Sequence, residues 1–162
     1  MNLRRTLFVL ALTLLAGNAV AQPMSPARNG AFPVAANRLV GLWNINVTSG
    51  PCLGGPSRSF VSNHTYHAGG TLTDAGRVPP TTRGPGQGIW EYQGRGRYKI
   101  RFQFNRFLPD GSFDGIQEVR NDLTLGATGA TYSATIYTRV LNPDGSLRTE
   151  LCGAANAERV VI

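Results

Sequence analysis

Residues 97–104 read Arg-Tyr-Lys-Ile-Arg-Phe-Gln-Phe, with an apolar side chain at every second position. Successive side chains of an extended strand point to opposite faces of a sheet. The even-numbered apolar residues therefore share one face, and the charged and amide groups share the other. This alternation is typical of an antiparallel strand with one face in a core and the other in water. The stretch predicts a half-buried β-strand.

The same period of two recurs from Arg38 onward, and no segment carries a convincing helical stripe. Pro-Asp-Gly at 109–111 and again at 143–145 predicts two hairpin turns. Residues 75–88 are rich in Pro and Gly, which disfavour a regular ladder, so we expect a long loop there and a candidate lid. The eight expected strands lie near residues 39–47, 58–66, 68–74, 87–93, 97–104, 113–126, 131–141 and 146–161.

The hairpin at 109–111 predicts a register, because facing residues of an antiparallel pair have a constant sum of residue numbers. A turn centred near residues 110 and 111 sets Phe102 opposite Val119 and Lys99 opposite Asp122. Apolar side chains then meet on one face and opposite charges meet on the other, as cross-strand pairing favours.

Cys52 and Cys152 are the two cysteines of the chain, one near each end of the strand region. In an oxidising compartment we expect them to form a disulfide, which brings the first and last strands side by side. Extending that pairing sets Trp43 opposite Val161. The sequence thus predicts an eight-stranded antiparallel up-and-down β-barrel, closed between its first and last strands.

Gly41, Trp43 and Arg159 resemble a signature of the lipocalin-like barrels of the calycin group. In that group a Gly-x-Trp stands on the first strand, and an Arg late in the last strand packs across the Trp. The resemblance implies that these three residues close one end of the barrel. The chain has no Thr-Asp-Tyr motif between its middle strands, so the resemblance concerns the architecture and points to no particular subfamily.

Residues 1–21 predict a cleaved signal peptide, with Arg4 and Arg5 before an apolar core and a small-residue site ending at Ala21. The apolar core is short for a membrane span. Residues 22–36 are rich in Pro, Ala and Asn and predict a disordered lead-in. The barrel domain is expected over 37–162, in a soluble protein that is periplasmic or secreted.

The chain has 16 basic and 9 acidic residues. A basic surface can meet nucleic acid, anionic lipid or acidic glycan. Here the charges alternate along strands and form no run, so we expect a solvated barrel exterior and no nucleic-acid partner. An alternative is an acidic partner, bound by basic residues of the exterior: Arg97, Lys99, Arg101 and Arg106.

Gln117 and Asn121 fall on the inward face of the strand at 113–126. A buried amide needs a partner, so these two either orient a ligand or bond each other, a buried water or Tyr98. With the aromatic residues of the inward faces they predict a pocket for a small, mostly apolar or amphipathic molecule. The candidate ligand-binding residues are Phe60, His64, Tyr66, Tyr98, Phe102, Phe104, Gln117 and Asn121.

Catalytic motifs are scarce in this sequence. His64 and His67 lie on opposite faces of a strand and cannot readily share a metal, and we expect neither metal nor cofactor. The sequence favours a binding protein over an enzyme. Two alternatives stay open. One is a small barrel enzyme of the cyclase or isomerase type, which needs a buried ionisable pair such as His64 with Tyr66 or Glu91. The other is an interaction or inhibitor module with a filled core.

Overall fold

The computed structural model describes residues 34–162. The predicted signal peptide and residues 22–33 of the predicted lead-in lie outside this range. A short 3-10 helix, η1 (Ala36–Leu39), precedes the strands. Its Ala36 is fully buried. The strands are β1 (Gly41–Pro51), β2 (Arg58–Tyr66), β3 (Thr71–Gly76), β4 (Gly86–Gly94), β5 (Arg97–Phe107), β6 (Phe113–Leu125), β7 (Thr131–Leu141) and β8 (Leu147–Arg159).

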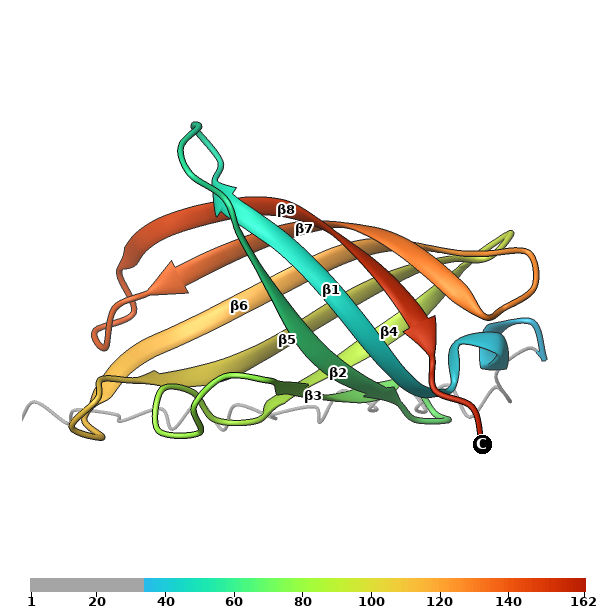
Figure 1. Cartoon of the computed structure of the whole chain (residues 1–162), viewed down its shortest axis with the longest axis horizontal. Helices are drawn as coiled ribbons and strands as arrows, with labels where there is room; N and C mark the ends of the chain where they lie inside the picture. Colours follow the sequence, from blue (N-terminus) through green and yellow to red (C-terminus); the bar gives the residue numbers. More distant parts are fainter. Residues whose placement is uncertain (1–33) are drawn as a thin grey trace, which may run out of the picture. The chain divides into compact units, whose positions relative to one another are not determined.

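The eight strands form a closed antiparallel barrel in which each strand pairs with its neighbours in the chain and β8 pairs with β1. Figure 1 shows β1 and β8 side by side, with the remaining strands following in sequence order. The predicted fold class is confirmed. Closure pairs the first strand with the last, so residues 34–162 satisfy most of their backbone groups within the sheet with little helix.

The β5–β6 register confirms the hairpin arithmetic. Phe102 pairs with Val119 inside the barrel, and Lys99 pairs with Asp122 outside it. The alternation read from residues 97–104 is also present, because the even-numbered apolar side chains are buried and the odd-numbered ones are exposed.

The β1–β8 register differs from the prediction by two residues. Trp43 pairs with Arg159, not with Val161. The disulfide joins Cys52 and Cys152, but β1 ends at Pro51, and the residue opposite Cys152 is Gly50. The bridge therefore runs diagonally between β1 and β8 at the end of β1. A disulfide in this position joins two residues that do not face each other across the strands.

The segment around β3 also differs from the prediction. β3 begins at Thr71, later than expected, because the backbone turns between His67 and Thr71. Gly69 and Gly70 have positive φ angles in this turn, which glycine adopts at little cost. The long irregular loop lies between β3 and β4, inside the predicted segment 75–88.

One end of the barrel is closed by the residues of the lipocalin-like signature. The Arg159 guanidinium lies over the Trp43 ring, 4.4 Å from its centroid. It donates hydrogen bonds to the carbonyl oxygens of Val40 at 2.6 Å and Gly129 at 3.0 Å, and to that of Arg38. The single arginine thus ties the start of β1, the end of β8 and the β6–β7 turn together.

η1 covers the same end. Leu39 is fully buried, and its carbonyl accepts a hydrogen bond of 2.9 Å from the Trp43 indole. The Tyr98 hydroxyl donates to the carbonyls of Ala35 and Ala36 at 3.1 and 3.2 Å. We call this the closed end. The opposite end, where the loops 52–57, 77–85, 108–112 and 142–146 lie, is called the open end.

No helix within residues 34–162 is long and apolar enough to cross a membrane.

Candidate functional site

The barrel interior holds a cavity of about 50 Å³ in its open half. Apolar walls come from six of the eight strands and include Val47, Phe102, Val119 and Ile136. The polar side chains of the lining include Ser62, His64, Asp74, Arg83, Gln117 and Asn121. Since a single water needs roughly 10–15 Å³ on this measure, the space holds a few non-hydrogen atoms. The barrel interior is mostly filled by its own side chains.

Asp74 is the centre of the polar cluster beside this cavity. Its side chain is 1% exposed, and Oδ2 forms an ion pair with Arg83. Its other oxygen, Oδ1, accepts a hydrogen bond of 2.5 Å from the Ser62 hydroxyl and lies 3.2 Å from Nε2 of His64. The strand pair β2–β3 produces this arrangement, because His64 lies directly opposite Asp74 in the register.

The ionisation of Asp74 follows from these contacts. Burial is the largest influence and opposes the charged form. It is outweighed by the hydrogen bond and electrostatic attraction of His64, by the charge of Arg83 and by the Ser62 hydroxyl, so that the pKa of Asp74 lies below its ordinary value. At neutral pH the cluster therefore holds a carboxylate next to a guanidinium, and these two charges balance.

A chain of hydrogen bonds continues from His64 toward the closed end. The Tyr66 hydroxyl lies 3.1 Å from Nδ1 of His64 and 3.4 Å from the Tyr132 hydroxyl. Burial, followed by the influence of Tyr132, raises the pKa of Tyr66, and burial also raises the pKa of Tyr132. Both phenols therefore stay protonated. Because an ionised carboxylate only accepts hydrogen bonds, Nε2 of His64 carries the proton that faces Asp74, and Nδ1 and the Tyr66 hydroxyl bond to each other.

Arg83 enters the cluster from the loop between β3 and β4. Backbone hydrogen bonds from Gly84 to Asn105 and from Phe107 to Thr82 tie this part of the loop to the end of β5. The guanidinium carbon lies 3.5 Å from the centroid of the Phe104 ring, and the side chain is 11% exposed. The loop predicted as a lid thus contributes the side chain that occupies the open end of the interior.

Two glycines leave space for the ion pair. A Cβ atom at Gly76 would lie 2.5 Å from Nη1 of Arg83, and a Cβ atom at Gly86 would lie 2.6 Å from Oδ2 of Asp74. These glycines end β3 and begin β4, the strands that flank the loop. Any other residue at either position would compete with the pair for the same volume.

Asn121 differs from the other polar residues of the lining. It is 7% exposed, and its Oδ1 atom is buried without a hydrogen-bond partner. Within residues 34–162 it is the one buried side-chain nitrogen or oxygen in that state. Asn121 pairs with Ile100 on β5 and with Ile136 on β7, so its cross-strand neighbours offer apolar side chains. Asn121 lines the cavity, and no donor of the described residues bonds to its Oδ1 atom.

The structure brings six of the eight predicted ligand-binding residues to the cavity: Phe60, His64, Phe102, Phe104, Gln117 and Asn121. Tyr66 and Tyr98 do not line it. Tyr66 is held in the hydrogen-bond chain behind His64, and Tyr98 caps the closed end through η1. Both are inward-facing as the alternation predicts, but the sequence does not show how far along the barrel axis each side chain lies.

Gln117 bonds to neither Asn121 nor Tyr98. Its Oε1 atom accepts a hydrogen bond of 3.2 Å from Arg106. Glu91 is exposed on the outer face of β4, because Trp90 takes the inward position and Ile89 the outward one. Of the two buried pairs considered for an enzyme, His64 with Tyr66 is formed and His64 with Glu91 is not.

Asp74 and Arg83 were missed by the sequence reasoning. The sequence does carry a signal for Asp74. Leu72 is apolar and therefore indicates an inward face, and Asp74, two residues later, shares that face. Arg83 lies in a Pro- and Gly-rich loop without periodicity, so nothing in the sequence indicates that its side chain points inward. No group of three or more potential metal ligands occurs among the described residues, 34–162.

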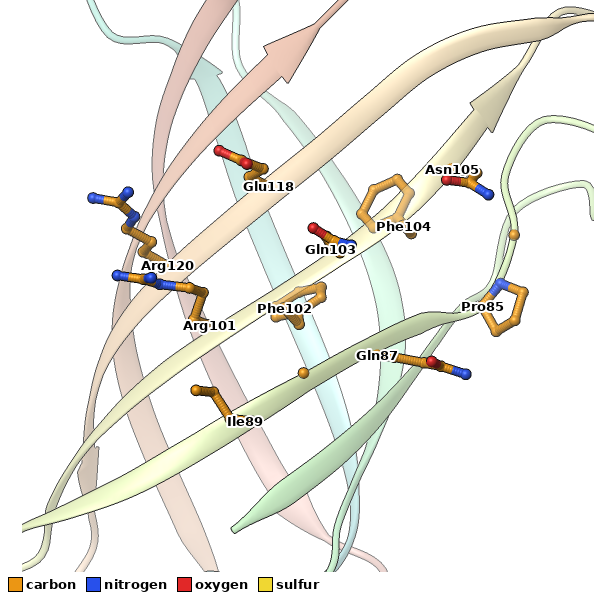
Figure 2. Close-up of a pocket in the computed structure, with 12 residues that line it drawn as sticks. Pro85, Gln87, Ile89, Arg101, Phe102, Gln103, Phe104, Asn105, Glu118 and Arg120 are labelled. Atoms are coloured by element: carbon orange, nitrogen blue, oxygen red, sulfur yellow. The ribbon is translucent and has the colours of Figure 1, made fainter. Parts of the chain in front are cut away.

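A wider groove of about 510 Å³ lies on the outer wall of β4, β5 and β6. Figure 2 shows its labelled side chains, among them Arg101 and Arg120, which face each other across the β5–β6 pair. Gln87, Gln103 and Ile89 also line it. This groove is open to solvent, whereas the interior cavity has the enclosed polar cluster, and we therefore take the interior as the candidate site.

No protein-family model and no curated protein matches the chain. Among solved structures, the chain is similar to the S-type phycobiliprotein lyase CPES from Guillardia theta. The two chains are 10% identical, with a TM-score of 0.39, and the match covers 78% of this chain and 90% of the lyase chain. The lipocalin-like arrangement is assigned from the strand order and closure of the barrel itself.

Proposed function

We propose that this protein is an exported calycin-type barrel that binds a small, mostly apolar or amphipathic molecule in the open half of its interior. The observation that carries the proposal is that Asn121 lines the cavity and its buried Oδ1 atom has no hydrogen-bond partner. A buried polar atom without a partner costs roughly 1–3 kcal/mol. A bound molecule that bonds to this atom removes that cost.

The size of the cavity limits the molecule. Typical ligand pockets measure roughly 300–1,000 Å³, far more than the space of about 50 Å³ found here. With Arg83 in place, the cavity accepts one short chain or one end of a longer one. The half-exposed ring of Phe60 lines the cavity and offers an apolar surface for the part that extends toward the open end.

The disulfide supports the exported part of the proposal. Disulfides persist in oxidising compartments and are rare in the cytosol. Detection of the mature N-terminus at Gln22, in protein recovered from the periplasm or medium of an expressing bacterium, would test the predicted signal peptide. Retention of residues 1–21 on the recovered protein would contradict it.

The binding proposal is tested by extracting purified protein with organic solvent and identifying any small molecule by mass spectrometry. The matched variants are Asn121→Leu, which removes the amide from the cavity, and Asn46→Leu, which removes an exposed amide from the outer face of β1. We expect a molecule that copurifies with the wild type and with Asn46→Leu, and less of it with Asn121→Leu. Equal recovery from all three proteins would contradict a role for Asn121.

A second candidate is a barrel enzyme that uses acid–base chemistry. The observation in its favour is that His64 lies in the cavity wall and bonds to both Asp74 and Tyr66. Such a chain resembles the way a carboxylate orients a catalytic imidazole. Both nitrogens of His64 are engaged in this arrangement, so a substrate would have to displace Tyr66 or Asp74. Turnover of an identified ligand that is lost in His64→Gln would favour this candidate over simple binding.

A further inference from the structure

We propose that the cavity selects an uncharged ligand whose polar group donates a hydrogen bond to Asn121. The chemical class is an alcohol, a phenol or an amide N–H on an apolar body, in preference to a carboxylate or an amine of the same length. This inference rests on the proposed binding function and specifies the ligand of that same site.

The need for a donor follows from the surroundings of Asn121. Its Oδ1 atom is a hydrogen-bond acceptor, and it is enclosed without a partner. Along β6, the inward neighbours are Val119 and Leu123, and across the sheet the neighbours are Ile100 and Ile136. None of these side chains has a donor. A hydroxyl or N–H group of a ligand can donate a hydrogen bond to Oδ1. An ether or a ketone of the same shape has no such donor and offers this atom only another acceptor.

The preference for an uncharged ligand follows from the titratable groups that face the cavity. They are His64 on β2, Asp74 on β3, Arg83 from the loop and Tyr132 on β7. Asp74 and Arg83 balance each other. Both carboxylate oxygens are engaged, Oδ1 by Ser62 and His64 and Oδ2 by Arg83.

Part of the Arg83 guanidinium is already engaged. One terminal nitrogen of its guanidinium pairs with Asp74, its Nε donates to the Gly84 carbonyl at 3.3 Å, and its face lies against Phe104. A ligand carboxylate in the cavity would compete with Asp74 for Arg83, and a ligand ammonium would compete with Arg83 for Asp74. Burying either charge without a partner is far more costly than burying a hydroxyl that bonds to Asn121.

The test uses four small probes with equal numbers of non-hydrogen atoms: 1-hexanol, its isomer methyl pentyl ether, pentanoate and hexylamine. Each is titrated at neutral pH into the disulfide-bonded mature protein, and the dissociation constant is measured from chemical-shift changes of cavity-lining methyl groups. We expect 1-hexanol to bind roughly three- to tenfold more tightly than the ether, the ratio that one neutral hydrogen bond provides. The two charged probes should bind more weakly than the ether.

The variants give a second readout. In Asn121→Leu the ratio between 1-hexanol and the ether should fall to about one or reverse, because an apolar wall offers no acceptor. Asn46→Leu, on the outer face, should keep the wild-type ratio. Should Asn121→Leu not fold, the comparison of the four probes on the wild type still decides the matter.

The possible failures are distinguishable. If the ether binds the wild type as tightly as the alcohol, or a charged probe binds most tightly, the selection is refuted while the binding function stands. If none of the four probes binds and no molecule copurifies, the proposed function fails and this inference fails with it.

Discussion

Replacement of Arg83 by methionine removes the guanidinium from the open half of the barrel and keeps much of its apolar volume. The partner of Arg83 is Asp74, whose side chain is 1% exposed, so the substitution leaves a buried carboxylate without its countercharge. Breaking a buried ion pair from one side typically costs about 3–5 kcal/mol. Ser62 and His64 still bond to Asp74, and we therefore expect the lower end of that range for Arg83→Met.

The assay is urea unfolding at neutral pH, with the free energy of unfolding compared between variants at unchanged slope. Lys99→Met is the matched control, because Lys99 pairs with Asp122 on the outer face at 3.9 Å with both side chains largely exposed. Such a pair contributes only about 0–1 kcal/mol. A double-mutant cycle with Asp74→Asn completes the set. The double variant should lose markedly less unfolding free energy than the sum of the two single losses, because it leaves no charge unpaired.

The same variant has a consequence for pH dependence. Arg83 is one of the groups that lower the pKa of Asp74, so this pKa should be higher in Arg83→Met than in the wild type. The loss of stability in acid should then begin at a higher pH. An Arg83→Met protein as stable as Lys99→Met, with an unchanged loss of stability in acid, would refute a stabilising role for the buried Asp74–Arg83 ion pair.

Three further predictions concern the barrel as a whole. Because the pKa of Asp74 is lower in the folded than in the unfolded chain, its contribution is fully present at neutral pH and is lost as the pH falls through the folded pKa; Asp74→Asn should flatten this part of a plot of unfolding free energy against pH. The disulfide closes a separation of 100 residues, so Cys152→Ser should lower the unfolding free energy in urea by roughly 4–5 kcal/mol in the chain-entropy model, and a loss below about 1 kcal/mol would contradict that model here. A Cβ atom at Gly153 would overlap the carbonyl oxygen of Thr48 on β1, so Gly153→Ala should force the closing strands apart and lower the thermal midpoint well below that of Ala154→Ser, an exposed neighbour; equal midpoints would show that the strands can adjust.

The fold was predictable because alternation is a local property of the chain. In residues 97–104 each side chain reveals its face by its polarity, and the turn at 109–111 then determines the partner of each of these residues on the neighbouring strand. The disulfide indicated which strands close the barrel, but it gave a register that is two residues off. A bridge attached beyond the end of a strand holds two strands close together, but it does not set which of their residues face each other.

The candidate site was predictable only in part. The inward position of Asn121 followed from its place in the alternation, and its lack of a partner followed only from its isoleucine neighbours on two other strands. Tyr66 and Tyr98 satisfy the same pattern and yet lie away from the cavity, because depth along the barrel axis depends on the stagger between strands.

The sequence by itself determined the number of strands, the side of the sheet that residues occupy in the clearly alternating strands, and the pairing across the tight hairpin, since these depend on neighbours within a few residues. Only the tertiary structure decided that the side chain of Arg83 extends inward from an irregular loop to neutralise Asp74, and that both residues line the small interior cavity. The physical reason is that a buried charge needs a partner in space, and an irregular loop carries no periodicity that would indicate where its side chains point.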